Sequence, residues 1–238
     1  MKLIIDPTLF KQYPDVLLGV VVLQNINNVG HDEAITQLLR DAEKEAIQKV
    51  GTIPVAEHPH IAPWREAYRT FGAKPKDYPS SIENLIRRIS KGEQIRHINK
   101  LVDIYNVISL RYLLPVGGED CDAIQGDVHL TIAGPDEKAI LLLGEKEPRP
   151  PYVNEVIYKD DNGAICRRWN WKESDRTKLT EGTTNAFMVL EALPPVDRPS
   201  LEKALFELKN LLQKYCGGEI TTTILDINNK ETDIQPNG

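Results

Sequence analysis

The chain has 238 residues, of which 41% are apolar and 27% are charged, and its formal net charge is −6. These proportions are ordinary for a globular protein and exclude collagen, coiled-coil and low-complexity sequences. No apolar run approaches the roughly 20 residues that cross a bilayer, the first residues lack a signal-peptide core, and three dispersed cysteines indicate no disulfide framework. We therefore expect a cytoplasmic protein with no membrane partner.

The first half of the chain contains two continuous apolar runs, followed by four segments in which apolar residues recur at helical spacing. The second run is rich in β-branched residues, which predicts a strand buried on both faces. Gly51 is placed to end the first helix, and the spacing of Ser80 and Glu83 predicts a capping box at the start of the third. The strands are expected at 2–5 and 16–23, and the helices at 34–50, 63–71, 81–91 and 99–110.

The second half is mostly strand-like. A glycine turn at 115–120 is expected to end the fourth helix, and residues 161–163 (Asp-Asn-Gly) predict a hairpin turn. Helices and strands that are grouped, without strict alternation, indicate an α+β fold with helices in the first half and mixed or antiparallel strands in the second. We expect one domain over 1–227 and a frayed polar tail over 228–238. The strands are expected at 128–132, 139–143, 153–158, 164–171, 186–190 and 219–225, and the last helix at 200–215.

Positive charge is concentrated in the middle of the chain. Between Arg65 and Arg111 there are ten basic and five acidic residues, a net charge of +5, so the remaining residues carry −11. A basic region in an acidic body can contact phosphates. Solvated helix faces would give the same pattern, and the charge alone favours that interpretation.

Two polar clusters are candidates for chemistry. Asn99, Asp103, Asn106 and Ser109 fall on one face of the fourth helix among strongly apolar neighbours. Because buried polar groups need partners, this series indicates either a helix-anchoring network or the wall of a pocket. The segment 167–172 (Arg-Arg-Trp-Asn-Trp-Lys) interleaves cations with indoles, which suits either base stacking or packing on two faces of a strand.

Conventional catalytic signatures are absent from the sequence. It contains no phosphate-binding loop, no dinucleotide fingerprint and no nucleophile elbow. The paired histidines His58 and His60 have no further partner at metal-ligand spacing. We therefore expect no metal and no cofactor.

Four ordered motifs resemble one known family. They are similar to the tRNA-binding and editing (B3/B4) module of the phenylalanyl-tRNA synthetase beta subunit, in its stand-alone bacterial form, and the likeness extends over about 51–193. The motifs are Trp64-Arg65-x-x-Tyr68-x-x-Phe71-Gly72, residues 78–82, residues 101–106 and residues 115–118.

The resemblance implies the module's fold and a deacylase that acts in trans on the acceptor end of a misacylated aminoacyl-tRNA. Gly117 occupies the place of the family's editing histidine, and residues 169–172, where the family reads a tyrosine hydroxyl, include no glutamate. The resemblance therefore implies a smaller or different acyl group. Because an aminoacyl ester is already activated, hydrolysis needs mainly a positioned water and a stabilised oxyanion.

The candidate site follows from these arguments. The amides of Gly117 and Gly118 are assigned to the oxyanion, and Asn106 or Asn170 to the attacking water. A non-catalytic RNA-binding module and a binder of amino-acid-like small molecules are the alternatives. The residues expected to bind tRNA or substrate are Arg65, Tyr68, Ser81, Arg88, Asp103, Ser109, Arg168, Trp169 and Lys172.

Overall fold

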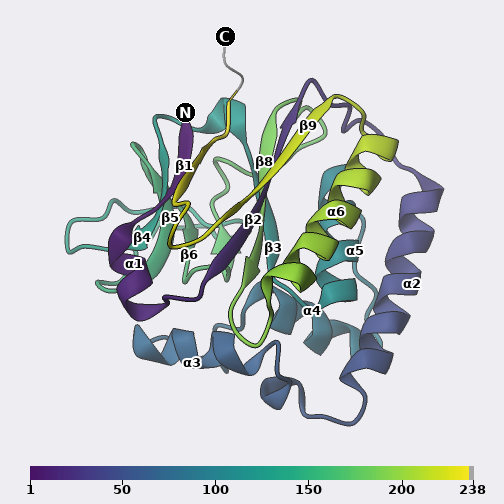
Figure 1. The fold of residues 1–238 in the computed structure, drawn as a ribbon, viewed down its shortest axis with the longest axis horizontal. Helices are drawn as coiled ribbons and strands as arrows, with labels where there is room; N and C mark the ends of the chain where they lie inside the picture. Colours follow the sequence, from purple (N-terminus) through teal and green to yellow (C-terminus); the bar gives the residue numbers. More distant parts are fainter. Residues whose placement is uncertain (236–238) are drawn as a thin grey trace.

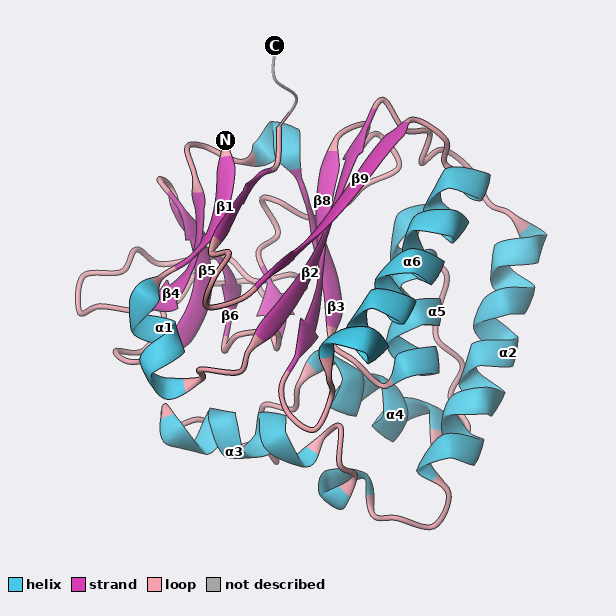
Figure 2. Cartoon of the chain, viewed as in Figure 1, coloured by secondary structure: helices cyan, strands magenta, loops and turns pink. Residues whose placement is uncertain are grey.

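Two β-sheets lie face to face, and helices cover the outer face of the second (Figures 1 and 2). The computed structural model describes residues 1–235. In spatial order the first sheet contains β10 (Glu231–Asp233), β1 (Lys2–Ile5), β4 (Val128–Ile132), β5 (Val156–Asp160), β6 (Gly163–Arg167) and β7 (Lys172–Glu173). The second sheet contains β3 (Val116–Asp120), β8 (Ala186–Ala192), β2 (Leu17–Gln24) and β9 (Glu219–Leu225).

The strands run in mixed directions. In the described part of the chain β1 and β4 are parallel, and all other neighbouring strands are antiparallel. Asp160 pairs with Gly163, so the turn between β5 and β6 has two residues, as the sequence predicts. The α+β fold class with mixed strands is confirmed.

The helices begin and end close to the predicted positions. Asp32 and Asn99 cap α2 and α5 by accepting hydrogen bonds from backbone amides, and Ser80 caps α4 in the same way. The reciprocal half of the predicted capping box is wrong, because Glu83 instead pairs with Arg65 and Arg87. The helices are α1 (Pro7–Gln12), α2 (Glu33–Val50), α3 (Ala62–Thr70), α4 (Ser81–Ile89), α5 (Lys100–Tyr112) and α6 (Arg198–Tyr215).

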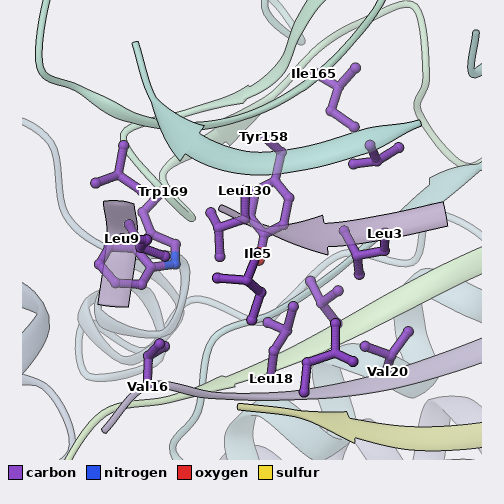
Figure 3. Packing of buried hydrophobic residues seen from close by; sticks show 14 of the residues in the cluster. Leu3, Ile5, Leu9, Val16, Leu18, Val20, Leu130, Tyr158, Ile165 and Trp169 are labelled. Carbon is purple, nitrogen blue, oxygen red and sulfur yellow. The ribbon is translucent and has the colours of Figure 1, made fainter. Parts of the chain in front are cut away.

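Strand β2 is buried on both faces, which explains its uninterrupted apolar sequence. Leu18 and Val20 point into the core between the two sheets. Val21 and Leu23 point the other way, into the core that the second sheet shares with α5 and α6. Figure 3 shows Leu3, Ile5 and Leu130 of the first sheet packed above Leu18 and Val20 of β2.

Several predicted elements are wrong. Residues 139–143 form only isolated bridges, and the strand predicted at 164–171 stops at Arg167, because Arg168 and Trp169 adopt positive φ angles of 49° and 65°. The expected glycine turn at 115–120 is instead strand β3, paired with β8. Helix α1 was not predicted.

The expected frayed tail is also wrong where the structure describes it. Strand β10 pairs with β1, and Ile234 is buried in the inter-sheet core. Residues 236–238 lie outside the described residues. The assignment of 1–227 to a single domain stays a prediction.

Candidate functional site

A cavity of about 280 Å³ lies between the two sheets, at the side where β5, β6 and β7 oppose β3 and β8. This volume is at the lower end of the roughly 300–1,000 Å³ typical of small-molecule sites. The start of α4 and the middle of α5 complete its wall. Its aromatic lining consists of Tyr105, Tyr158, Trp169, Trp171 and Phe187.

Glu191 is held by a chain of hydrogen bonds at one end of this cavity. The Tyr158 hydroxyl and the Asn170 Nδ2 each donate to its carboxylate at 2.5 Å. The Tyr68 hydroxyl in turn donates to Asn170 Oδ1 at 2.8 Å. Glu191 is 1% exposed, and burial raises the pKa of its carboxyl to about 7. Near neutral pH this oriented group therefore exists in both protonation states.

Two further carboxyls, Glu119 on β3 and Glu173 on β7, line the cavity from opposite sheets. Burial raises the pKa of Glu119 well above its ordinary range, and the nearby charge of Glu173 raises it further. Burial raises the pKa of Glu173 to about 7. Within residues 1–235, Glu119 Oε2 is buried without a hydrogen-bond partner. A buried polar atom of this kind is costly unless a ligand satisfies it.

The strand register places Glu191 at one end of the cavity and Glu119 at the other. Glu119 lies opposite Phe187 on β8, and Glu191 is four residues further along the same strand. Four residues correspond to about 13 Å of strand. Val189 and Gly117 lie between the ends and also line the cavity.

Gly117 and Gly118 have different surroundings although they are neighbours on β3. A Cβ added to Gly117 would meet no atom within 4 Å, whereas one added to Gly118 would lie 2.8 Å from Met188 Cγ. The Glu191 amide donates to Pro115 O. Because hydrogen-bonded pairs alternate in an antiparallel ladder, the amide of Gly117 points to β8. The amide of Gly118 points away from β8, to the edge where the Asp120 amide donates to Thr177 O.

Comparison with known proteins places these features in a family. A family model described as the B3/4 domain matches residues 63–217. The chain belongs to the B3/4 domain family. The phenylalanine–tRNA ligase beta subunit of Psychrobacter arcticus is 29% identical over 129 residues, covering 50% of this chain and 16% of that subunit.

A likeness to a solved structure accompanies this match. A crystal structure of an N-terminal fragment of the phenylalanyl-tRNA synthetase beta subunit from Pyrococcus horikoshii has a TM-score of 0.47 and 13% identity. The alignment covers 93% of this chain and 53% of the fragment. This B3/4 domain thus spans only a minor part of the curated ligase subunit that it matches.

The four residues assigned to chemistry from the sequence come together in this B3/4 domain. Asn106, Gly117, Gly118 and Asn170 all line the cavity. The turn invoked for the glycines is wrong, and the ladder engages the amide of Gly117. The amide of Gly118 points away from β8 and takes no part in that ladder.

The polar residues of α5 serve both of the roles that the sequence allowed: some anchor the helix and one lines the pocket. Asn99 caps the helix, Asp103 accepts from the Ile98 amide and from His97 Nδ1 at 2.5 Å, and Ser109 donates to Leu114 O. These three residues anchor the helix and lie outside the cavity lining. Asn106 alone forms part of the pocket wall.

The predicted binding residues separate in a similar way. Ser81, Trp169 and Lys172 line the cavity, and the Tyr68 hydroxyl reaches it through Asn170. Arg65 and Arg88 are committed to ion pairs with Glu83 and Glu93. Their contacts therefore stabilise the α3–α4 region.

Arg168 is buried beside the cavity and does not project into solvent. Its guanidinium lies 3.7 Å from the ring centroid of Tyr78 and 4.4 Å from that of Trp171. Burial lowers its pKa, and the nearby Glu155 raises it. Glu155 is itself bound by both Arg167 and the Arg168 amide. The arginine thus supports the turn that brings Trp169, Asn170 and Trp171 to the cavity.

Sequence reasoning missed the three glutamates that line the cavity, since Asp103 is the only acidic residue among the predicted site residues. Glu191 carried a readable signal, since it interrupts the apolar run of β8. Glu173 directly follows segment 169–172, where the resemblance places the family's glutamate, whereas Glu119 carried no signal, because only strand pairing brings it to the cavity. Within residues 1–235, no three His, Cys, Asp or Glu side chains come together as metal ligands do. Among the same residues, none of the helices has the length and apolar character of a membrane span.

Proposed function

We propose that this B3/4 domain binds the aminoacylated end of a tRNA and hydrolyses the ester in trans. One observation carries the proposal: a cavity sized for an aminoacyl group contains Glu191, oriented by Tyr158 and Asn170 and with a pKa of about 7. A carboxyl with such a pKa can exchange protons efficiently at neutral pH.

Each remaining step has a candidate group in the cavity. Glu191 accepts a proton from the attacking water as the oxygen adds to the ester carbonyl. The negative charge that develops on the carbonyl oxygen is met by the Asn106 side chain. When the ester bond breaks, Glu191 returns the proton to the departing ribose oxygen. Asn170 is a positioning residue here, since both of its side-chain atoms already bind Tyr68 and Glu191.

The nucleic acid would approach beside the segment that precedes α4. Tyr78 packs against Trp171 of the cavity with ring centroids 5.0 Å apart. Lys74 and Lys76, a few residues earlier, are exposed. Their charges favour a phosphate backbone near the mouth of the cavity, while the acidic remainder of the surface disfavours it elsewhere.

A deacylation screen tests the proposal. The purified chain is incubated with tRNAs that carry correct and incorrect amino acids, and ester loss is compared with buffer. We expect accelerated release of at least one acyl group and a loss of about 100-fold in Glu191→Gln, which keeps the shape of the side chain but cannot accept the proton. Glu202→Gln, on the exposed face of α6, is the matched control and retains full activity.

Other outcomes would identify the two alternatives. Salt-sensitive retention of tRNA without any ester release contradicts the hydrolase and indicates a binding module. Affinity for free amino acids that responds neither to salt nor to tRNA indicates a small-molecule site.

A further inference from the structure

The cavity has an excess of acidic groups that ester hydrolysis does not explain. Glu191 serves the ester at one end, which leaves Glu119 and Glu173 at the other end without an assigned role. In the described part of the chain the only cationic side chain in the lining is Lys172, and its Nζ pairs with Glu145 at 3.0 Å. The far end of the cavity is therefore electronegative once its carboxyls ionise.

Glu119 shows that this end is built to meet a ligand. The residue is 6% exposed and lines the cavity, and its Oε2 has no hydrogen-bond partner within residues 1–235. Glu173 faces it from the other sheet, with Tyr105 of α5 close to both. Two buried carboxyls among aromatic rings are unfavourable when ionised, although Thr177 and the charge of Arg176 lower the pKa of Glu119, and a cation that donates hydrogen bonds relieves the remaining cost.

Building on the proposed hydrolase, we propose that the acyl group accepted by this cavity carries a positively charged side chain, bound by Glu119 and Glu173. Because Glu191 and the pair Glu119 and Glu173 lie at different ends of the cavity, the cation is assigned to the side chain of the acyl group and not to its α-amino group. A short acyl group at Glu191 would leave the other end unfilled. A basic amino acid of the lysine, ornithine or arginine class carries its cation on such a side chain.

A metal ion fits these carboxyls less well than an organic cation. A divalent ion needs several oxygen ligands within about 2.6 Å of one point. Within residues 1–235 no three such side chains come that close together. An organic ammonium or guanidinium group needs only hydrogen-bond acceptors, so two carboxyls are enough to bind it.

The decisive experiment compares two esters that differ in charge but hardly in length. One tRNA is charged with either lysine or norleucine, and the release rates are measured with the full chain. We expect lysine to be released at least tenfold faster. In Glu119→Gln and in Glu173→Gln the ratio of the two rates falls toward one, whereas Glu202→Gln keeps it.

The outcomes separate this inference from the function on which it rests. Release of norleucine at the same rate as lysine, or faster, overturns the inference and leaves the hydrolase standing.

If neither the full screen nor these two esters show release, the hydrolase fails. Binding of lysinamide and norleucinamide is then measured by calorimetry. A tenfold preference for lysinamide that Glu119→Gln abolishes would support the cation site, and equal or undetectable binding of both would overturn it. Thermal melts of each variant establish that it is folded.

Discussion

The space between the two sheets is filled at one side and hollow at the other. Where β1 and β4 oppose β2, the branched side chains of Leu3, Leu130 and Leu18 are fully buried in one core cluster (Figure 3). Where β7 and β6 oppose β3 and β8, Gly117 offers no side chain, and glutamates take positions that would otherwise be apolar. The same layer thus provides stability on one side and a ligand site on the other.

This contrast shows how a B3/4 domain makes room for chemistry. Close packing is what makes burial favourable, so an unfilled volume lined by carboxyls reduces the free energy of unfolding. The packed side must offset that cost. Substitutions on the two sides should therefore differ in kind: the packed side should respond in stability and the hollow side in pH dependence and ligand binding.

The largest expected effect is on the packed side. Leu130 on β4 is fully buried in the inter-sheet core. Leu130→Ala should lower the free energy of unfolding by about 2–5 kcal/mol, since it removes buried apolar surface and leaves a cavity. Urea denaturation measures this. A loss below about 1 kcal/mol would contradict the view that this side is tightly packed.

A smaller effect is expected from pH on the hollow side. Burial raises the pKa of Glu191 from 4.5 to about 7, so the folded state retains a proton that the unfolded state loses. The contribution of Glu191 to stability is therefore present below pH 4.5 and falls as the pH rises toward 7, by up to about 3 kcal/mol.

Denaturation of the protein and of Glu191→Gln at pH 5 and pH 8 isolates this contribution. The protein should lose more stability than the variant between the two values, because the variant has no proton to release. Glu202→Gln should follow the unsubstituted protein. An identical pH dependence in all three would show that Glu191 is not protonated by burial.

The sharpest local test uses the two adjacent glycines. Gly118→Ala should lower stability by about 1–3 kcal/mol, because its Cβ would lie 2.8 Å from Met188 Cγ and 3.1 Å from Phe187 O. Gly117→Ala should change stability by less than about 0.5 kcal/mol, since its Cβ enters the open cavity. Paired thermal melts measure both. Equal destabilisation would mean that the cavity beside Gly117 is closed in solution.

Local signals in the sequence account for most of the helices. Apolar stripes and capping residues located α2, α4 and α5 within a few residues, because caps and periodicity act over a single turn. The two-residue turn between β5 and β6 was equally readable. These features depend on neighbours in the chain and need no knowledge of the fold.

The errors arose where a distant partner determines the local structure. Two glycines in succession resemble a turn, but pairing with β8 makes 116–120 a strand. The apolar run at 139–143 resembles a strand, but it forms only isolated bridges. Arg168 resembles an exposed phosphate ligand, yet the rings of Tyr78 and Trp171 enclose it.

The sequence by itself determined the fold class, the helix boundaries and, through its ordered motifs, the B3/4 family. It also indicated that Asn106, Asn170 and the glycine pair belong near one another. Only the tertiary structure revealed the acidic character of the cavity, since Glu119, Glu173 and Glu191 come from three strands of two sheets. Burial depends on the opposing sheet, and the pKa of a carboxyl depends on burial, so no local pattern could specify either.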